Sequence, residues 1–172
     1  MKKNQSVELE RLEINMRVVL EGCDGVGKTT LAKLISDKYN IDICHCTQND
    51  PTDFDFYFNT LRKNNIVWDR HVIGELVYPK IFNRESKLRF DEAKNIVDFG
   101  KSIGVKFFVL TSDENEIRFR IYNRDQYEDP TVIDRIFAIN KSFIHYAKKL
   151  NVDIIDTSVL SISEIFNLLE SK

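Results

Sequence analysis

The residues with the clearest chemical potential form a glycine-rich loop, in which Gly22 is followed five residues later by Gly27-Lys28-Thr29. Glycines allow the backbone to approach an anion closely. The loop N–H groups and the positive end of the following helix dipole then point at that anion. The lysine adds a point charge for the β- and γ-phosphates, and the threonine offers a hydroxyl to Mg²⁺. The pattern therefore predicts a site for a nucleoside triphosphate with magnesium.

The residues on either side of this loop predict the structure that such a loop requires. The apolar run 16–20 predicts a strand, and the apolar positions after the loop lie on one face of a helix that ends near Tyr39. Strand, loop and helix together are the context of a phosphate-binding loop. We expect the phosphates of ATP to bind Gly22, Gly25, Val26, Gly27, Lys28, Thr29 and Thr30.

A short charged motif, Asp69-Arg70-His71, follows the apolar run 66–68. The run predicts a strand that delivers charge at its C-terminal end. An acidic residue in that position holds Mg²⁺ through water. We therefore expect Thr29 and Asp69 to share the metal.

Two arginines, Arg120 and Arg124, are four residues apart and face the same way if the segment is helical. Paired guanidinium groups on a mobile segment can neutralise charge in a phosphoryl-transfer transition state. Arg118 lies about 200° away around such a helix and is a weaker candidate. A solvated charged helix surface is an equally good interpretation of this segment taken alone.

The wider pattern alternates apolar strands with helices. Strands are expected at 16–20, 41–47, 66–68, 105–111 and 152–155. Helices are expected after the glycine loop, at 53–64, from His71 to about Pro79, from a cap at Asp91 to Gly104, after a capping box at Asp113 and Glu116, after Asp129-Pro130, and after a capping box at Ser161 and Glu164. This alternation is typical of the α/β class, with a parallel sheet covered on both faces. Right-handed crossovers then place the loop and Asp69 along one edge of the sheet.

Composition limits the class of protein further. The 172 residues, 42% of them hydrophobic, fit a single domain over 1–172, with residues 1–14 as a charged tail. The net charge of −2 gives no basic field for nucleic acid, and no apolar run reaches the ~18 residues of a membrane span. The N-terminus has no apolar core of a secretory signal. We expect a cytoplasmic protein whose partners are small nucleotides, without nucleic acid or membrane.

The motif Cys44-His45-Cys46 suggests a metal site, but its spacing argues against one. In a strand the two cysteines share one face and the histidine points to the other, which prevents joint ligation. Zinc sites also space their cysteines by two to four residues. We interpret the cysteines as two small buried hydrophobic residues on a central strand.

Together these motifs resemble the thymidylate kinase family. The segment Glu21 to Thr30 (EGCDGVGKTT) is similar to the phosphate-binding loop of that family, Asp69-Arg70-His71 to its D-R-[YH] motif, and 120–128 to its lid. The resemblance runs from Met16 to the C-terminus and is to the compact, virus-type deoxynucleoside monophosphate kinases. It implies a P-loop kinase fold, with a five-stranded parallel sheet, helices on both faces and a short arginine-bearing lid at about 118–129.

The resemblance also implies a reaction and roles for individual residues. The reaction is transfer of the γ-phosphoryl group of ATP, with Mg²⁺, to a deoxynucleoside 5′-monophosphate, with dTMP giving dTDP favoured. Asp24 would meet the 3′-hydroxyl of the acceptor and Arg70 its 5′-phosphate, while Lys28, Arg120 and Arg124 would act on the transferring group. Members of the family often form homodimers, which is the oligomeric state that the resemblance implies.

The acceptor side departs from the family, and the acceptor base stays open. The segment 47–53 lacks the arginine that the family usually carries after its second strand. Gly25 stands where some members place an arginine, which fits the members that draw this charge from the lid. Glu75 either binds a sugar hydroxyl or caps a turn. Tyr78 and the aromatic residues of 54–57 either stack on the base or belong to the core.

Two alternative functions remain open. A deoxynucleoside kinase would phosphorylate a 5′-hydroxyl and needs a general base, for which Glu21, Asp69 and Glu75 are candidates. Arg70 favours the monophosphate, because a guanidinium matches a phosphate in a bidentate way. A non-catalytic nucleotide-binding regulator is the second alternative, and it would tolerate loss of the lid arginines.

Overall fold

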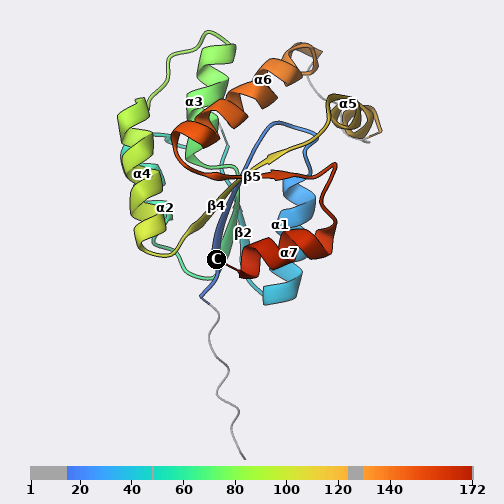
Figure 1. Cartoon of the computed structure of the whole chain (residues 1–172). Coiled ribbons are helices and arrows are strands. Elements are labelled where there is room, and N and C mark those ends of the chain that lie inside the picture. The colour runs from blue at the N-terminus through green and yellow to red at the C-terminus, as the bar shows by residue number, and fades with distance from the viewer. Residues whose placement is uncertain (1–14, 48, 124–129, 172) are drawn as a thin grey trace, which may run out of the picture.

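Five parallel strands form the sheet at the centre of the molecule (Figure 1). The computed structural model describes residues 15–47, 49–123 and 130–171. The strand order is β2-β3-β1-β4-β5, which confirms the five-stranded parallel sheet expected from the sequence. The strands are β1 (Arg17–Glu21), β2 (Asp42–His45), β3 (Ile66–Asp69), β4 (Lys106–Thr111) and β5 (Asp153–Asp156).

The register of the sheet brings the ends of β1 and β3 level with each other. β1 is the central strand, and four of its five residues are buried. Leu20 of β1 pairs with Asp69 of β3, and Asp69 in turn pairs with His45 of β2. Because all the strands are parallel, the loop after β1 and the charged motif after β3 leave the sheet at the same edge.

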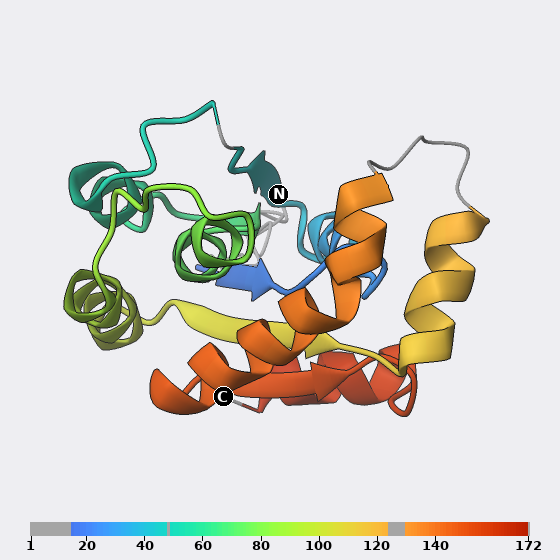
Figure 2. The same cartoon turned by 90° about the horizontal axis from the view of Figure 1, so that it is seen from above.

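Helices cover both faces of this sheet (Figure 1). On one face α1 (Lys28–Tyr39) and α7 (Ile162–Glu170) lie side by side, with the rings of Tyr39 and Phe166 6.3 Å apart. The other face carries α2 (Phe54–Thr60), α3 (Val72–Ile81), α4 (Phe90–Ser102) and α6 (Pro130–Lys149). The short helix α5 (Glu114–Tyr122) stands beyond the carboxyl ends of the strands, next to α6 (Figure 2).

The prediction that the cysteines lie on a central strand was wrong, because β2 lies at the edge of the sheet. It is an edge strand of four residues and its side chains are mostly exposed. Cys44 is therefore only half-buried, and Cys46, which is buried, follows the end of the strand. After β1 and α1 the chain forms β2 two positions away in the sheet, and β3 then lies between β1 and β2. Within the described residues, no three His, Cys, Asp or Glu side chains are grouped so that they could hold a metal ion.

Two helix starts also differ from the prediction. α4 begins two residues earlier than expected, with Arg89 as its N-cap, so Asp91 lies in the first helical turn. Asp113 caps α5 by accepting from two backbone N–H groups. The carboxylate of Glu116 turns instead to Arg120, so the expected capping box is only half formed.

Other helix boundaries agree with the sequence. The capping box of α7 is complete, because Ser161 Oγ accepts from Glu164 N and the Glu164 carboxylate accepts from Ser161 N at 2.8 Å. Pro79 lies in the last turn of α3, which ends two residues later. Within the described ranges, none of the helices combines the length and the apolar character needed to cross a membrane.

Two phenylalanines allow a test of the core between α3 and α6. Phe143 of α6 is fully buried and packs edge-on against Tyr78 of α3, with ring centroids 5.8 Å apart. We expect Phe143→Ala to lower the free energy of unfolding by about 3–5 kcal/mol, because it leaves a cavity. Phe119 of α5 is 64% exposed, and Phe119→Ala should change it by less than about 0.5 kcal/mol. Urea denaturation measures both, and equal losses would contradict this packing.

Candidate active site

The glycine-rich loop joins β1 to α1 and is enclosed by two other elements. Gly22 has a φ of +136°, and a Cβ there would collide with the backbone oxygen of Leu110 in β4. Gly25 has a φ of +85°, and a Cβ there would lie 3.0 Å from Ile117 in α5. Glycine, which has no Cβ, tolerates both the positive φ and the close neighbour at these two positions. A side chain at position 25 would therefore collide with α5.

Lys28 opens α1, immediately after Gly27 in the left-handed conformation. Its side chain is 5% exposed, and its Nζ donates to the carbonyl oxygen of Cys23 at 2.7 Å. Burial lowers the pKa of Lys28, and the nearby Asp24 carboxylate opposes that shift. The ammonium group therefore lies folded over the loop, next to the place where the loop would bind phosphates.

Thr29 and Asp69 meet across the sheet edge, as expected for a shared metal. The hydroxyl of Thr29 donates to Asp69 Oδ2 at 2.6 Å. The other carboxylate oxygen, Oδ1, is buried without a hydrogen-bond partner among the described residues. A hydroxyl beside an unpartnered carboxylate oxygen suits Mg²⁺, which prefers oxygen ligands and retains several waters. When bound, the ion would neutralise charge on the phosphates.

Arg70 and Asp24 form an ion pair beside the loop. Arg70 has a φ of +74°, which is costly for a residue with a side chain and is typical of functional sites. Burial is the largest single effect on the pKa of Arg70 and lowers it, but Asp24, Tyr78 and Asp69 together outweigh burial and raise the pKa. Nε of Arg70 is buried and has no hydrogen-bond partner among the described residues. The guanidinium is thus permanently charged and retains a donor for a further acceptor.

This ion pair lies in the wall of an open pocket of about 610 Å³, a volume that suits a small-molecule ligand. The pocket is bounded by the glycine-rich loop, the segment after β2, the helices α2 and α3, and the start of α6. Its lining is made of Asp24, Cys46, Thr47, Asn49, Thr52, Tyr57, Arg70, His71, Gly74, Glu75, Tyr78, Phe82, Arg84, Thr131 and Val132.

Glu75 and Tyr78, both predicted to bind the acceptor, line this pocket from α3. Burial raises the pKa of the half-buried Glu75 carboxyl, and one of its oxygens accepts from Lys87 N at 3.3 Å. The ring of Tyr78 packs against Phe82 and Phe143, while its buried hydroxyl lacks a partner among the described residues. The ring of Tyr78 therefore packs in the core, and the residue also lines the pocket.

Among the other candidate aromatics, only Tyr57 lines the pocket. Phe54 stacks on Phe58, and Phe56 packs edge-on against Tyr57. The buried His71, which also lines the pocket, packs edge-on against Tyr57, and its Nε2 is 2.9 Å from the hydroxyl of Thr60. Burial lowers the pKa of His71 to about 3, so the imidazole is neutral and supports the pocket wall by packing.

Glu21, at the end of β1, is fully buried beneath this pocket. One carboxyl oxygen accepts from Ile73 N at 2.6 Å, and the other lacks a hydrogen-bond partner among the described residues. Burial raises the pKa of Glu21 from 4.5 to about 7, although backbone donors oppose the shift. The carboxyl therefore joins the end of β1 to the first turn of α3.

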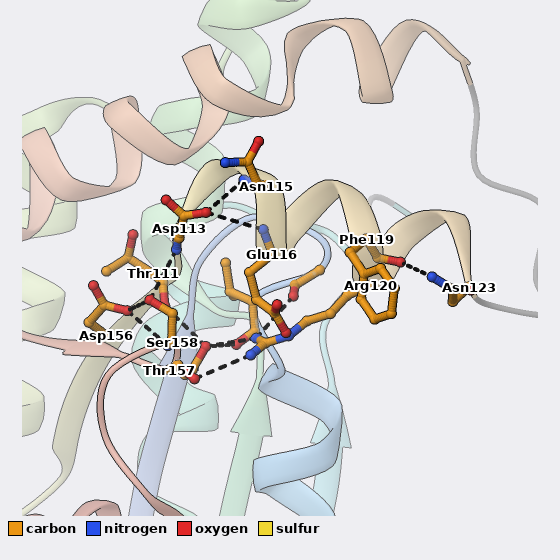
Figure 3. Close-up of polar contacts among 12 residues, drawn as sticks. Thr111, Asp113, Asn115, Glu116, Phe119, Arg120, Asn123, Asp156, Thr157 and Ser158 are labelled. Carbon is orange, nitrogen blue, oxygen red and sulfur yellow. Dashed lines mark hydrogen bonds and ion pairs between the residues drawn. The ribbon is translucent and has the colours of Figure 1, made fainter.

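Arg120 faces the glycine-rich loop from α5 (Figure 3). Its Nε donates to Glu116 at 2.7 Å, and its Nη1 to the hydroxyl of Thr157 at 2.9 Å and to Gly25 O at 3.4 Å. Arg118 turns away, with its guanidinium 4.4 Å from the centre of the Phe137 ring. Arg124 lies outside the described residues. The structure thus brings Lys28, Thr29, Asp69, Asp24, Arg70 and Arg120 around one loop.

The sequence did not identify Thr157, Phe82 or Arg84 as candidate residues. Thr157 directly follows β5, so the rule that sites form at the carboxyl edge of a parallel sheet was the available signal. Phe82 and Arg84 come after α3, and no motif marks them. Their place in the pocket depends on how α3 packs against α6.

Known proteins resemble this chain in sequence and in fold. No family model matches the chain. A probable thymidylate kinase of Methanocaldococcus jannaschii is 21% identical over an alignment of 182 positions that covers 89% of this chain and 93% of the relative.

Solved structures share the fold along nearly the whole chain. The YorR protein of Bacillus subtilis, in complex with phosphorylated GDP, matches with a TM-score of 0.74 and 21% identity, covering 90% of this chain and 96% of that one. Deoxyadenosine kinase from M. mycoides, with products dCMP and a flexible dCDP bound, matches with a TM-score of 0.58 and 19% identity, covering 91% and 100%.

The chain therefore has the fold of the P-loop nucleotide kinases, which are phosphotransferases. Within that class its sequence resembles thymidylate kinase, as its motifs predicted.

The buried Glu21 gives a pH-dependent prediction. Between pH 4.5 and about 7 the unfolded chain releases the Glu21 proton while the folded chain retains it, so this contribution to stability falls as the pH rises. Glu21→Gln does not titrate and can still accept from Ile73 N. We expect the variant and the wild type to be equally stable near pH 4.5 and the variant to be about 3 kcal/mol more stable near pH 8. Urea denaturation across this range measures the difference, and a difference independent of pH would contradict it.

Proposed function

We propose that the protein transfers the γ-phosphoryl group of ATP, with Mg²⁺, to a deoxynucleoside 5′-monophosphate, with dTMP as the favoured acceptor. The observation that carries the proposal is the Asp24–Arg70 ion pair in the pocket wall, beside the glycine-rich loop. The resemblance further supports a single catalytic domain that pairs into a homodimer.

The chemistry of Arg70 favours a phosphorylated acceptor. Its guanidinium is charged and half-exposed to the pocket, and it offers planar donors that match a phosphate group. Asp24 beside it would accept from the 3′-hydroxyl of the sugar, so one ion pair would recognise both ends of the sugar phosphate. A monophosphate is already ionised and requires no general base.

Catalysis would consist of positioning and charge stabilisation, without a covalent intermediate. The loop residues Gly22, Gly25, Val26, Gly27, Lys28, Thr29 and Thr30 would bind the phosphates of ATP. Thr29 and Asp69 would hold Mg²⁺, and the charges of Lys28 and Arg120 would act on the transferring group. Arg124 stays a prediction for the same role.

The favoured base follows from the resemblance, while the pocket itself accommodates several. Tyr57, Tyr78 and Phe82 supply aromatic surface, which every base can contact. The YorR protein holds a guanine nucleotide and the M. mycoides enzyme a cytosine nucleotide. The acceptors tested should therefore include purines as well as dTMP.

A deoxynucleoside kinase is the second candidate, and Glu75 is the observation in its favour. Its carboxyl lines the pocket and burial raises its pKa, which suits a general base for a 5′-hydroxyl. The likeness in fold to a deoxyadenosine kinase agrees with this alternative.

An acceptor panel decides between these functions. ADP release from ATP and Mg²⁺ is measured with each deoxynucleoside monophosphate, each free deoxynucleoside and no acceptor. We expect stimulation by monophosphates and the highest kcat/KM with dTMP. Stimulation by free nucleosides alone would assign the alternative kinase. ATP binding without stimulation by any acceptor would contradict both kinases and favour a nucleotide-binding regulator.

Lys28 gives the sharpest test of catalysis. We expect Lys28→Met to lower kcat with dTMP by at least about 100-fold, because it removes a charge aimed at the transferring group. Lys33→Met is the matched control, because Lys33 is exposed on the same helix, and it should leave kcat unchanged. Circular dichroism verifies that both variants are folded. A Lys28→Met variant with near-normal kcat would contradict the proposed role.

A further inference from the structure

The backbone carbonyls of the glycine-rich loop have partners supplied by distant parts of the chain. A loop that turns its N–H groups toward an anion leaves carbonyl oxygens directed away from it. The carbonyl of Val26 accepts from the hydroxyl of Thr157 at 2.9 Å, although the two residues are 131 positions apart. The carbonyl of Gly25 accepts from Arg120 Nη1 at 3.4 Å. These contacts restrain the orientation of two peptide groups in the loop.

Thr157 is itself held firmly at the carboxyl edge of the sheet. Its backbone N–H donates to Thr111 O, at the end of β4, at 2.9 Å. Its carbonyl accepts from Arg120 Nη2 at 3.2 Å, and its hydroxyl accepts from Arg120 Nη1 at 2.9 Å. A hydroxyl has one proton and can accept twice, so it can accept from the arginine while donating to one carbonyl. Two carbonyl oxygens lie within reach of the Thr157 hydroxyl, and Val26 O at 2.9 Å is nearer than Thr111 O at 3.2 Å.

Arg120 is oriented in turn by Glu116, one helical turn earlier in α5. Figure 3 shows the resulting network, which runs from Glu116 through Arg120 to Thr157. From Thr157 it continues to the carbonyl of Val26. Three separate elements, α5, the segment after β5 and the loop, are therefore joined at one hydroxyl.

The carbonyl of Cys23 has a different kind of partner. It accepts from Lys28 Nζ, a group that the proposed reaction needs for phosphates. The proposed reaction does not use the hydroxyl of Thr157 as a phosphate ligand. This hydroxyl bonds instead to the backbone of the protein and to Arg120. The Val26 peptide can thus retain its orientation when the lysine turns to a ligand.

We propose that Thr157 is a positioning residue for the donor nucleotide: its hydroxyl holds the Val26 peptide so that the loop N–H groups face the triphosphate. It acts through Val26 and Arg120. The inference rests on the part of the proposed function in which this loop binds ATP, and it does not depend on which acceptor is used.

The test is how tightly the full chain binds a non-hydrolysable ATP analogue in the presence of Mg²⁺. Calorimetry measures this dissociation constant. Thr157→Val keeps the shape and removes the hydroxyl, and we expect about a tenfold weaker binding of the analogue. Thr157→Ser keeps the hydroxyl and should bind within about twofold of the wild type. The dissociation constant of dTMP should be the same in all three proteins, because the acceptor pocket does not include Thr157.

Ser158→Ala is the matched control at the neighbouring position. Its hydroxyl contacts Asp156 and the N–H of Asp113, and neither belongs to the loop, so binding of the analogue should not change. Glu116→Gln is a second route to the same network, which weakens the restraint on Arg120, and we expect about threefold weaker binding. Glu116→Gln replaces Thr157→Val as the test variant if thermal unfolding shows that Thr157→Val is not folded.

Wild-type affinity for the analogue in a folded Thr157→Val protein would overturn the proposal. A loss that Thr157→Ser does not restore, or an equal loss of dTMP affinity, would also overturn it, since either would indicate a general structural role. The proposed function can fail separately. If binding of the analogue depends on Thr157 but the wild type transfers no phosphate to any monophosphate, the role of Thr157 stands and the proposed kinase activity is contradicted.

Discussion

The orientation of the peptide groups in the glycine-rich loop is the constraint on which the rest of the site depends. N–H groups that converge on an anion leave carbonyl oxygens facing outward, and buried carbonyls need donors. β4 approaches the loop so closely that Gly22 admits no side chain, and α5 does the same at Gly25. Thr157 and Arg120 then supply donors to the outward carbonyls. The local conformation of six residues is thus maintained by elements from the second half of the chain.

Several charges at the same sheet edge are buried beside opposite charges. Lys28 is buried near Asp24 and Asp69, and Arg70 is paired with Asp24. Asp24 therefore stands between the two halves of the site, with the phosphate-binding loop on one side and the pocket on the other. A buried charge without such partners is costly. Reorganisation of these pairs around incoming phosphates is the electrostatic step that a P-loop kinase requires, since phosphoryl transfer depends on positioned positive charge.

The two halves of the site differ in how strongly they define a function. The loop, Thr29 and Asp69 meet at one edge of the sheet, and the fold comparisons agree on the fold that carries them. The pocket is built mainly from residues that follow β2 and from α3, and it offers aromatic rings and carboxyl groups that suit several acceptors. The class of protein is therefore much better defined than the acceptor. Base recognition depends on a few contacts in this pocket, not on the chemistry at the loop.

The sequence by itself determined the elements and the chemistry that depend on local patterns. The glycine spacing, the apolar runs and the capping motifs predicted the loop, all five strands and the cap of α7, because neighbours in sequence decide backbone conformation there. Only the tertiary structure decided that β2 lies at the sheet edge, that Glu21 is buried under α3, and that Thr157 meets Val26. These features join residues far apart in the chain, and their geometry arises from how helices pack on the sheet. No local pattern encodes such packing, so it becomes visible only in the folded molecule.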